Sequence, residues 1–186
     1  MKLRDLSLVK FSQDMSNLSL YVLGKAFDSV VDGEGLRETI FVQGCPHHCE
    51  GCHNPESWAN RNPDAKDELL VDLYKEATGN PLWQGVTFSG GEPFLQQFAV
   101  LAANLHASNL DVWCYTGFLL EELLLRSDSD EGVRNLLSQI DVLVDGHFIL
   151  AQRDLSAHFK GSANQRVIDM KKSISAGSVI LHELNG

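Results

Sequence analysis

The sequence predicts an α/β fold in which about five to six parallel strands form an incomplete, open β/α barrel. Short apolar runs alternate with amphipathic stretches of about ten to fifteen residues, which is the pattern of repeated βαβ units. The chain has 186 residues, whereas a closed eight-stranded barrel typically needs about 250. At ~31 residues per strand–helix unit, the ~150 residues from Leu36 onward supply about five units, so the barrel cannot close.

We expect a single domain over residues 1–186, with an N-terminal extension (1–36), a core (37–169) and a C-terminal tail (170–186). The extension is the least readable part. Patchy alternation in LSLVKF and LSLYVLGKAF favours one or two short strands, and DGEGLR favours a turn.

Strands and helices alternate from Glu38 onward. Runs rich in apolar and β-branched residues predict strands at 38–43, 85–88, 110–116, 140–146 and, more weakly, 166–169. Apolar residues at helical spacing predict helices at 64–78, 94–105, 119–126 and 131–138.

Composition and charge exclude several classes of protein. A hydrophobic share of 44% with 22% charged residues is ordinary for a globular protein, so disordered and fibrous classes are excluded. The net charge of −10 argues against nucleic acid as a partner. No apolar run suits a membrane span, and the start MKLRDLSLVKF lacks a signal-peptide core, so we expect a cytoplasmic protein without a membrane partner.

Three of the four cysteines lie in one loop directly after the strand at 38–43. Cys45, Cys49 and Cys52 have the spacing Cys-x3-Cys-x2-Cys. Three thiolates can ligate three irons of a [4Fe–4S] cluster and leave the fourth iron open, and an open position distinguishes a catalytic metal site from a closed one. A tetrahedral zinc site with His47, His48 or His53 as the fourth ligand is the alternative.

A glycine-rich turn, Ser89-Gly90-Gly91-Glu92-Pro93, follows the next strand. Paired glycines permit close approach of a ligand, and the acid can receive a cationic group. A plain strand-to-helix turn, with Pro93 near the first helical position, explains it equally well. The turn and the cysteine loop both end parallel strands, so they face the same edge of the sheet, where α/β ligand sites lie.

The cysteine loop and SGGEP together resemble the radical S-adenosylmethionine (SAM) superfamily. The segments VDGEGLRETIFVQGCPHHCEGCHNPESW, TFSGGEPF, DVWCYTGF, DVLVDGHF and KGSANQRVID, in this order, are similar to one branch, the anaerobic ribonucleoside-triphosphate reductase-activating proteins. The resemblance runs from about Phe27 to Asp169 and implies the radical SAM type of open barrel.

The resemblance implies cofactors and site residues. Cys45, Cys49 and Cys52 would hold a [4Fe–4S] cluster whose open iron chelates the methionyl group of SAM. Near SAM, the resemblance places Gly51, Cys52, His53, Gly90, Gly91 and Glu92, the last three at its methionyl end. No catalytic side chain is expected beyond the cluster ligands. Two departures stand out: Gly51 replaces an aromatic residue that touches adenine in much of the superfamily, and the family's DGPG-like turn reads Asp32-Gly33-Glu34-Gly35.

The implied reaction is an oxidoreduction. One electron from the cluster cleaves SAM, and the resulting 5′-deoxyadenosyl radical takes a hydrogen from a glycine of the partner, the glycyl-radical subunit of the anaerobic reductase. Flavodoxin or ferredoxin would donate the electron. The alternatives are an activating enzyme of pyruvate formate-lyase or another glycyl-radical enzyme, a radical SAM enzyme with a small-molecule substrate, and a zinc-stabilised or electron-carrying binding module.

Four further residues lie in the segments that carry the resemblance. Cys114, inside a predicted strand, is expected to be buried structure. Asp145 ends a strand at the site edge, where a turn-forming Asp-Gly explains it better than a ribose contact. Asn164 and Gln165 lie in a motif segment to which the sequence alone assigns no role.

Overall fold

The computed structural model of the chain describes residues 1–183. Its centre is a seven-stranded sheet in the order β3-β1-β2-β4-β5-β6-β7. The strands are β1 (Ser19–Ser29), β2 (Arg37–Val42), β3 (Lys66–Leu69), β4 (Gly85–Gly90), β5 (Asp111–Tyr115), β6 (Val142–Asp145) and β7 (Arg166–Asp169).

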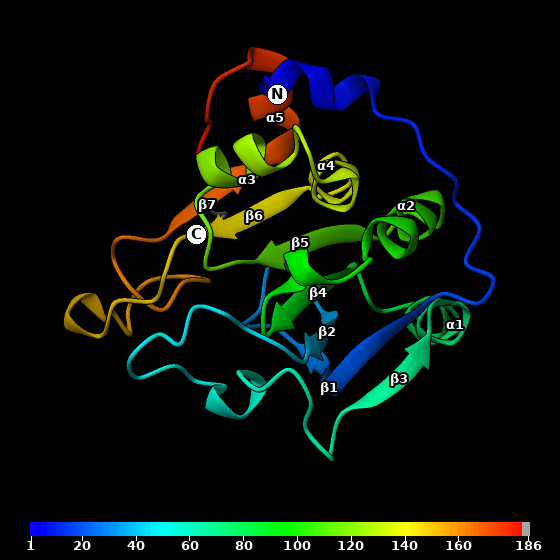
Figure 1. Cartoon of the computed structure of the whole chain (residues 1–186), viewed down its shortest axis with the longest axis horizontal. Coiled ribbons are helices and arrows are strands. Elements are labelled where there is room, and N and C mark those ends of the chain that lie inside the picture. Colours follow the sequence, from blue (N-terminus) through cyan, green and yellow to red (C-terminus); the bar gives the residue numbers. More distant parts are fainter. Residues whose placement is uncertain (184–186) are drawn as a thin grey trace.

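Within residues 1–183 there are also five α-helices and four short 3-10 helices, and most of them lie between strands (Figure 1). The α-helices are α1 (Leu70–Gly79), α2 (Ala99–Ala107), α3 (Leu120–Arg126), α4 (Glu131–Leu137) and α5 (Met170–Ala176). The 3-10 helices are Leu3–Leu8, Pro55–Ser57, Pro93–Leu95 and Leu150–Gln152. Aspartate side chains cap the N-termini of α4 and α5, since Asp130 accepts a hydrogen bond from the Val133 amide and Asp169 accepts one from the Lys172 amide.

The predicted α/β class is confirmed, and the strand directions refine it. Pairings β2·β4, β4·β5 and β5·β6 are parallel, whereas β1 is antiparallel to both β2 and β3. β7 is antiparallel to β6. The four middle strands are parallel, as expected. The expectation of five to six parallel strands is wrong for the strands on both flanks, which are antiparallel to their neighbours.

β7 is antiparallel because of the path that leads to it. A parallel strand requires a crossover that carries the chain back to the opposite edge of the sheet. Residues 146–165 contain only the 3-10 helix Leu150–Gln152 and remain at the edge where β6 ends, so the chain enters β7 from that edge.

In the first half of the chain, one predicted helix begins later than expected, and one of the two candidate strands forms. The helix expected from residue 64 begins at Leu70, because Lys66–Leu69 pairs with β1 as strand β3. The first run, LSLVKF at residues 6–11, forms no strand; its first three residues belong to the 3-10 helix Leu3–Leu8, which packs against α5. The second run forms β1, which joins the same sheet as the core strands.

The sheet has an apolar core on each face. Alternate residues of one strand point to opposite faces, and Val112 and Cys114 belong to the main core between sheet and helices, while Trp113 belongs to a smaller cluster with Val142 and Val144. Cys114 is fully buried, as expected. No helix among residues 1–183 is long and apolar enough to cross a membrane.

One carboxyl group in this sheet makes stability depend on pH. Glu38 is fully buried in β2, and its pKa is raised to about 8. Burial is the largest cause, and the negative charges of Glu76 and Glu68 act in the same direction, while the positive charge of Lys25 lowers the pKa. The folded protein thus holds this proton more tightly than the unfolded chain, whose pKa is near 4.5. The contribution of Glu38 to the free energy of unfolding is fully present below the pKa of the unfolded chain. It is lost as the pH rises through the pKa of the folded protein.

Glu38→Gln is therefore expected to reduce the fall in the free energy of unfolding between pH 5 and pH 8. Urea unfolding of both proteins across this range measures it, with Glu131→Gln, a change of an exposed glutamate, as the control for the loss of one charge. Equal slopes in the wild type and Glu38→Gln would contradict the assignment.

Candidate cluster and cofactor site

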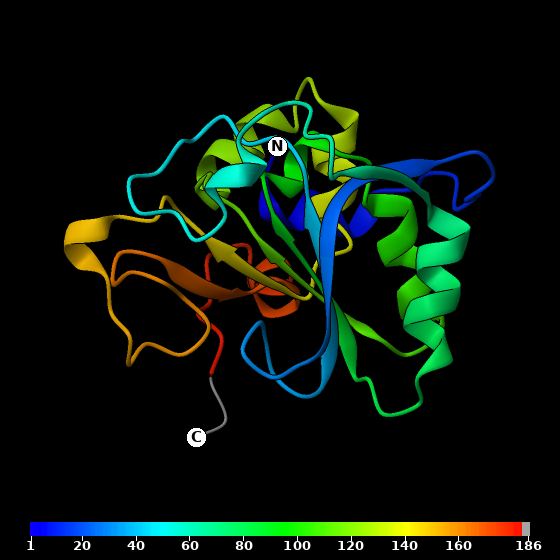
Figure 2. The same cartoon turned by 90° about the horizontal axis from the view of Figure 1, so that it is seen from below.

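The cysteine loop starts where β2 ends, at the edge formed by the carboxyl ends of the parallel strands. In both views the loop (residues 45–60) and the connection to β7 (residues 146–165) extend from the same side of the sheet (Figures 1 and 2). Cys45, Cys49 and Cys52 line one cavity of about 120 Å³ together with Gly90 and Gly91. The predicted meeting of the cysteine loop with the glycine turn is thus observed.

The three sulfur atoms receive hydrogen bonds from the backbone. The amides of His47 and His48 are directed at Cys45, that of Phe148 at Cys49, and the Asn54 amide lies 3.4 Å from the Cys52 sulfur. Burial raises the pKa of the Cys45 and Cys49 thiols, and the backbone amides act in the opposite direction. Amides aimed at sulfur stabilise thiolates and tune iron–sulfur clusters.

This donor set fits a [4Fe–4S] cluster. Three cysteines with amide donors surround one cavity, as a cluster with one open iron requires. No three His, Cys, Asp or Glu side chains within residues 1–183 are placed to hold one metal ion. Two histidines of the zinc alternative have other partners, because His47 lies 2.8 Å from Glu92 and His48 stacks on Trp58 at 5.0 Å.

The two glycines of the turn permit close packing of the chain on itself. A Cβ atom at Gly90 would lie 2.5 Å from the Val42 nitrogen, and one at Gly91 would lie 2.3 Å from the Gly44 carbonyl oxygen. The amides of Gly91 and Glu92 donate to Val42 and Gly44 at 2.7 and 2.8 Å. The backbone of the turn therefore packs directly against the start of the cysteine loop, and the turn also lines the cavity.

Glu92 lies behind this turn, outside the residues that line the cavity. Its side chain is fully buried, and its carboxylate oxygens lie 2.8 Å from His47 Nε2, 2.9 Å from Thr116 Oγ1 and 3.0 Å from the Gly117 amide. It also accepts from the Phe94 amide at 3.1 Å and thereby caps the short helix at Pro93. Glu92 joins the cysteine loop to the loops after β4 and β5.

Comparisons with known proteins show the family of the chain. Residues 31–168 match the family model of a 4Fe-4S single cluster domain. The anaerobic ribonucleoside-triphosphate reductase-activating protein of Haemophilus influenzae is 37% identical over 147 residues, which cover 73% of this chain and 89% of that protein. The chain belongs to this activating-protein family. The Vibrio cholerae member is 36% identical with the same coverage. The crystal structure of QueE from Escherichia coli aligns with a TM-score of 0.44 at 17% identity over 55% of each chain.

Sequence reasoning missed two residues of this site. His147 follows β6, and its Nδ1 atom lies 3.6 Å from the Cys49 sulfur, while its ring meets the edge of His47 at 4.5 Å. Its neighbour Phe148 lines the cluster cavity. Only their position directly after a predicted strand at the site edge could have indicated them.

Asn164 and Gln165 now have a structural role. Asn164 Nδ2 donates to the His147 carbonyl at 2.8 Å, and Gln165 Nε2 donates to the Gly146 carbonyl at 2.9 Å. The Gln165 oxygen accepts from the amides of Gly161 and Ser162. These two amide side chains hold the segment 146–148 in place beside Cys49.

Asp145 has structural partners other than the Asp-Gly turn that the sequence favoured. Its carboxylate accepts from the Leu120 amide at 2.8 Å and from Arg166 Nε at 2.9 Å, so it joins the start of α3 to β7.

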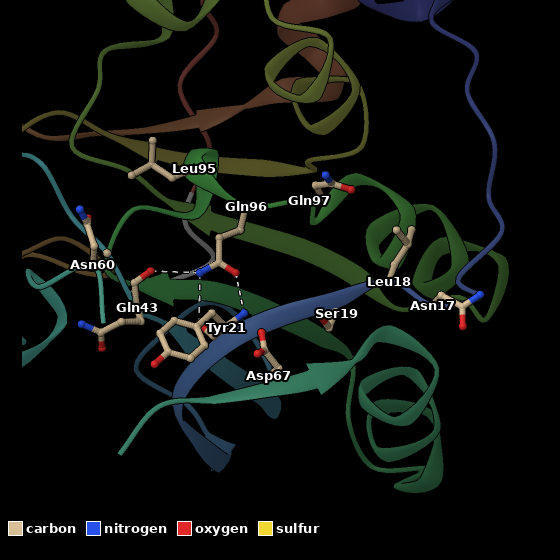
Figure 3. A pocket seen from close by; sticks show the side chains of 11 residues that line it. Asn17, Leu18, Ser19, Tyr21, Gln43, Asn60, Asp67, Leu95, Gln96 and Gln97 are labelled. Atoms are coloured by element: carbon tan, nitrogen blue, oxygen red, sulfur yellow. Dashed lines mark hydrogen bonds between the residues drawn. The ribbon is translucent and has the colours of Figure 1, made fainter. Parts of the chain in front are cut away.

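A separate polar hollow of about 530 Å³ lies behind the start of the cysteine loop (Figure 3). Within it, Gln96 Nε2 donates to the carbonyls of Tyr21 and Gln43, and Gln96 Oε1 accepts from the Tyr21 amide (Figure 3). Gln96 thus fixes the end of β2 relative to β1, immediately before the loop that carries the cysteines.

Proposed function

We propose that this chain is a radical SAM activating enzyme that generates the glycyl radical of anaerobic ribonucleoside-triphosphate reductase. The observation that carries the proposal is the cavity lined jointly by three cysteines and the Gly90–Gly91 turn, in a chain of the activating-protein family. The cofactors are a [4Fe–4S] cluster and SAM, and the enzyme is an oxidoreductase.

The proposed roles follow from the positions of the residues. Cys45, Cys49 and Cys52 hold three irons and leave one open. The backbone of Gly90 and Gly91 forms the wall at the methionyl end, while Glu92 acts from behind by holding that wall against the cysteine loop. A reduced cluster held there would supply one electron to cleave SAM into methionine and a 5′-deoxyadenosyl radical; that radical would take a hydrogen atom from a glycine of the reductase, giving 5′-deoxyadenosine and a glycyl radical.

The chain's own contribution is placement. The amides directed at the cysteine sulfurs stabilise their thiolate form, and the glycine turn excludes side chains from the cavity. Gly51 and His53 flank Cys52, and His53 lines a larger adjoining cavity of about 500 Å³. This second cavity shares Cys52 and Gly90 with the first, so it offers the space that a nucleoside attached to the methionyl group requires.

We infer that the sheet is the open type of β/α barrel and that its open side admits the glycine segment of the reductase. β3 and β7 end the sheet, and no pairing joins them among residues 1–183. A flavodoxin or ferredoxin would supply the electron, in a cytoplasmic setting. The charge of −10 suits a chain whose macromolecular contact is another protein.

The test is anaerobic reconstitution with iron and sulfide, followed by absorbance, electron paramagnetic resonance and a SAM-cleavage assay. Mixing the reduced, SAM-loaded protein with anaerobic ribonucleoside-triphosphate reductase should produce a glycyl-radical signal. Mixing it with pyruvate formate-lyase should not, and a signal there alone would replace the proposed partner. A colourless protein that binds one zinc ion and no iron would overturn the cluster.

A further inference from the structure

The inference concerns the nucleoside end of SAM and rests on the function proposed above. The cluster cavity of about 120 Å³ and the adjoining cavity of about 500 Å³ have several lining residues in common. The shared residues are Cys52, Ser89, Gly90, Tyr115, Phe148 and Gln165. A ligand anchored at the cysteines through a methionyl group therefore extends into the larger cavity past Phe148.

Leu150, with Phe148 next to it, lies where a side chain at position 51 would be. A Cβ atom at Gly51 would lie 2.9 Å from Leu150 Cδ1 and 3.4 Å from Phe148 Cε1, and Gly51 itself has φ +74°. The segment after β6 thus covers the cysteine loop at this point. Phe148 thus places an aromatic ring close to Gly51, in cavities that Cys52 also lines.

His53 lies across from this ring. The two ring centroids are 6.5 Å apart and the rings are tilted by 37°, so they do not stack on one another. Both rings line the larger cavity, so a planar base inside it can contact each of them.

The segment that carries Phe148 is fixed in place. Asn164 and Gln165 bind the carbonyls of His147 and Gly146, and a Cβ at Gly161 would lie 3.0 Å from Phe148 Cδ2. The Phe148 amide is directed at the Cys49 sulfur. The ring therefore holds a defined position relative to the cysteines before any ligand binds, which reduces the entropic cost of binding.

We propose that the rings of Phe148 and His53 bind the adenine of SAM in the larger cavity. Stacking of a base on an aromatic ring contributes enough that removal of the ring weakens binding about ten- to one-hundred-fold. The methionyl end of SAM, which contacts the cluster and the Gly90–Gly91 turn, does not depend on these rings.

The experiment compares ligands that contain and lack the adenine. Phe148→Leu keeps an apolar side chain and removes the ring, and the variant is reconstituted and checked for iron and sulfide content. Equilibrium binding of SAM, 5′-deoxyadenosine and methionine is then measured anaerobically. We expect the Kd of SAM and of 5′-deoxyadenosine to rise at least tenfold, with the Kd of methionine unchanged. Phe148→Tyr, which restores a ring, should bind SAM as the wild type does.

Phe159→Leu is the matched control, because this ring lies in the same connection but packs on Trp113 at 5.2 Å and lines neither cavity. Unchanged SAM affinity in Phe148→Leu, or an equal loss for methionine, would overturn the adenine assignment. If Phe148→Leu failed to take up iron, His53→Leu with the same three ligands would decide. Failure of the wild type to bind SAM would instead overturn the proposed function, so the two failures are distinguishable.

Discussion

Alanine at any one of Cys45, Cys49 or Cys52 is expected to abolish SAM cleavage and to leave reconstituted protein without an intact [4Fe–4S] cluster. All three sulfurs line a single cavity, and no other cysteine lines it. With two thiolates the cluster would have two open irons and lose a supporting bond. Iron and sulfide content, the absorbance of the cluster and the yield of 5′-deoxyadenosine measure the loss.

Cys114→Ala is the matched control for these variants. Cys114 is fully buried in β5 and belongs to the main apolar core, so its replacement should cost about 1 kcal/mol of stability and leave iron uptake intact. SAM cleavage that persisted in one of the three loop variants would remove that cysteine from the ligand set. Loss of iron in Cys114→Ala would place the cluster elsewhere.

Replacement of Glu92 by alanine is expected to be the most destabilising single change near the site. The carboxylate is fully buried and accepts hydrogen bonds from His47, Thr116 and Gly117. Removing one partner of a buried pair leaves the others unsatisfied, which costs about 3 kcal/mol or more. Urea unfolding of the protein before reconstitution measures this loss separately from any effect of the cluster.

Two further variants are compared with Glu92→Ala: Glu92→Gln as the conservative change and Glu121→Gln as the surface control. Glutamine keeps one acceptor oxygen at position 92, so its loss should be smaller than that of alanine. Glu121 pairs with Arg166 on the surface, and its side chain is 55% exposed, so Glu121→Gln should cost less than about 1 kcal/mol. We also expect Glu92→Ala to take up less iron, because His47 and the cysteine loop lose their anchor. A Glu92→Ala variant as stable as the wild type would contradict this structural role.

The alternation of strands and helices from β2 to α4 was predictable because each element has its own local pattern. The strand Lys66–Leu69 was not, because its charged residues carry no strand pattern and it exists by pairing with β1. The direction of β7 was not predictable either, since it depends on the path of residues 146–165.

The candidate site divides in the same way. The cysteines and Gly90–Gly91 could be placed together because they end neighbouring parallel strands. The burial of Glu92 behind the turn could not be foreseen, because the sequence does not reveal that Thr116 and His47 would meet its carboxylate. The role of Asn164 and Gln165 depends on carbonyls almost twenty residues away, at Gly146 and His147.

The antiparallel return of β7 has a consequence for how this scaffold can vary. Since residues 146–165 leave the sheet and re-enter it at the same edge, this arch can lengthen or shorten without moving a strand. Its first residues are tied to Cys49, and its last residues are tied back to its first by Asn164 and Gln165. Insertions between these two anchor points would alter which molecule reaches the cavity and leave the cysteines in place. The arch is therefore the natural place to graft a new specificity onto an unchanged cluster loop.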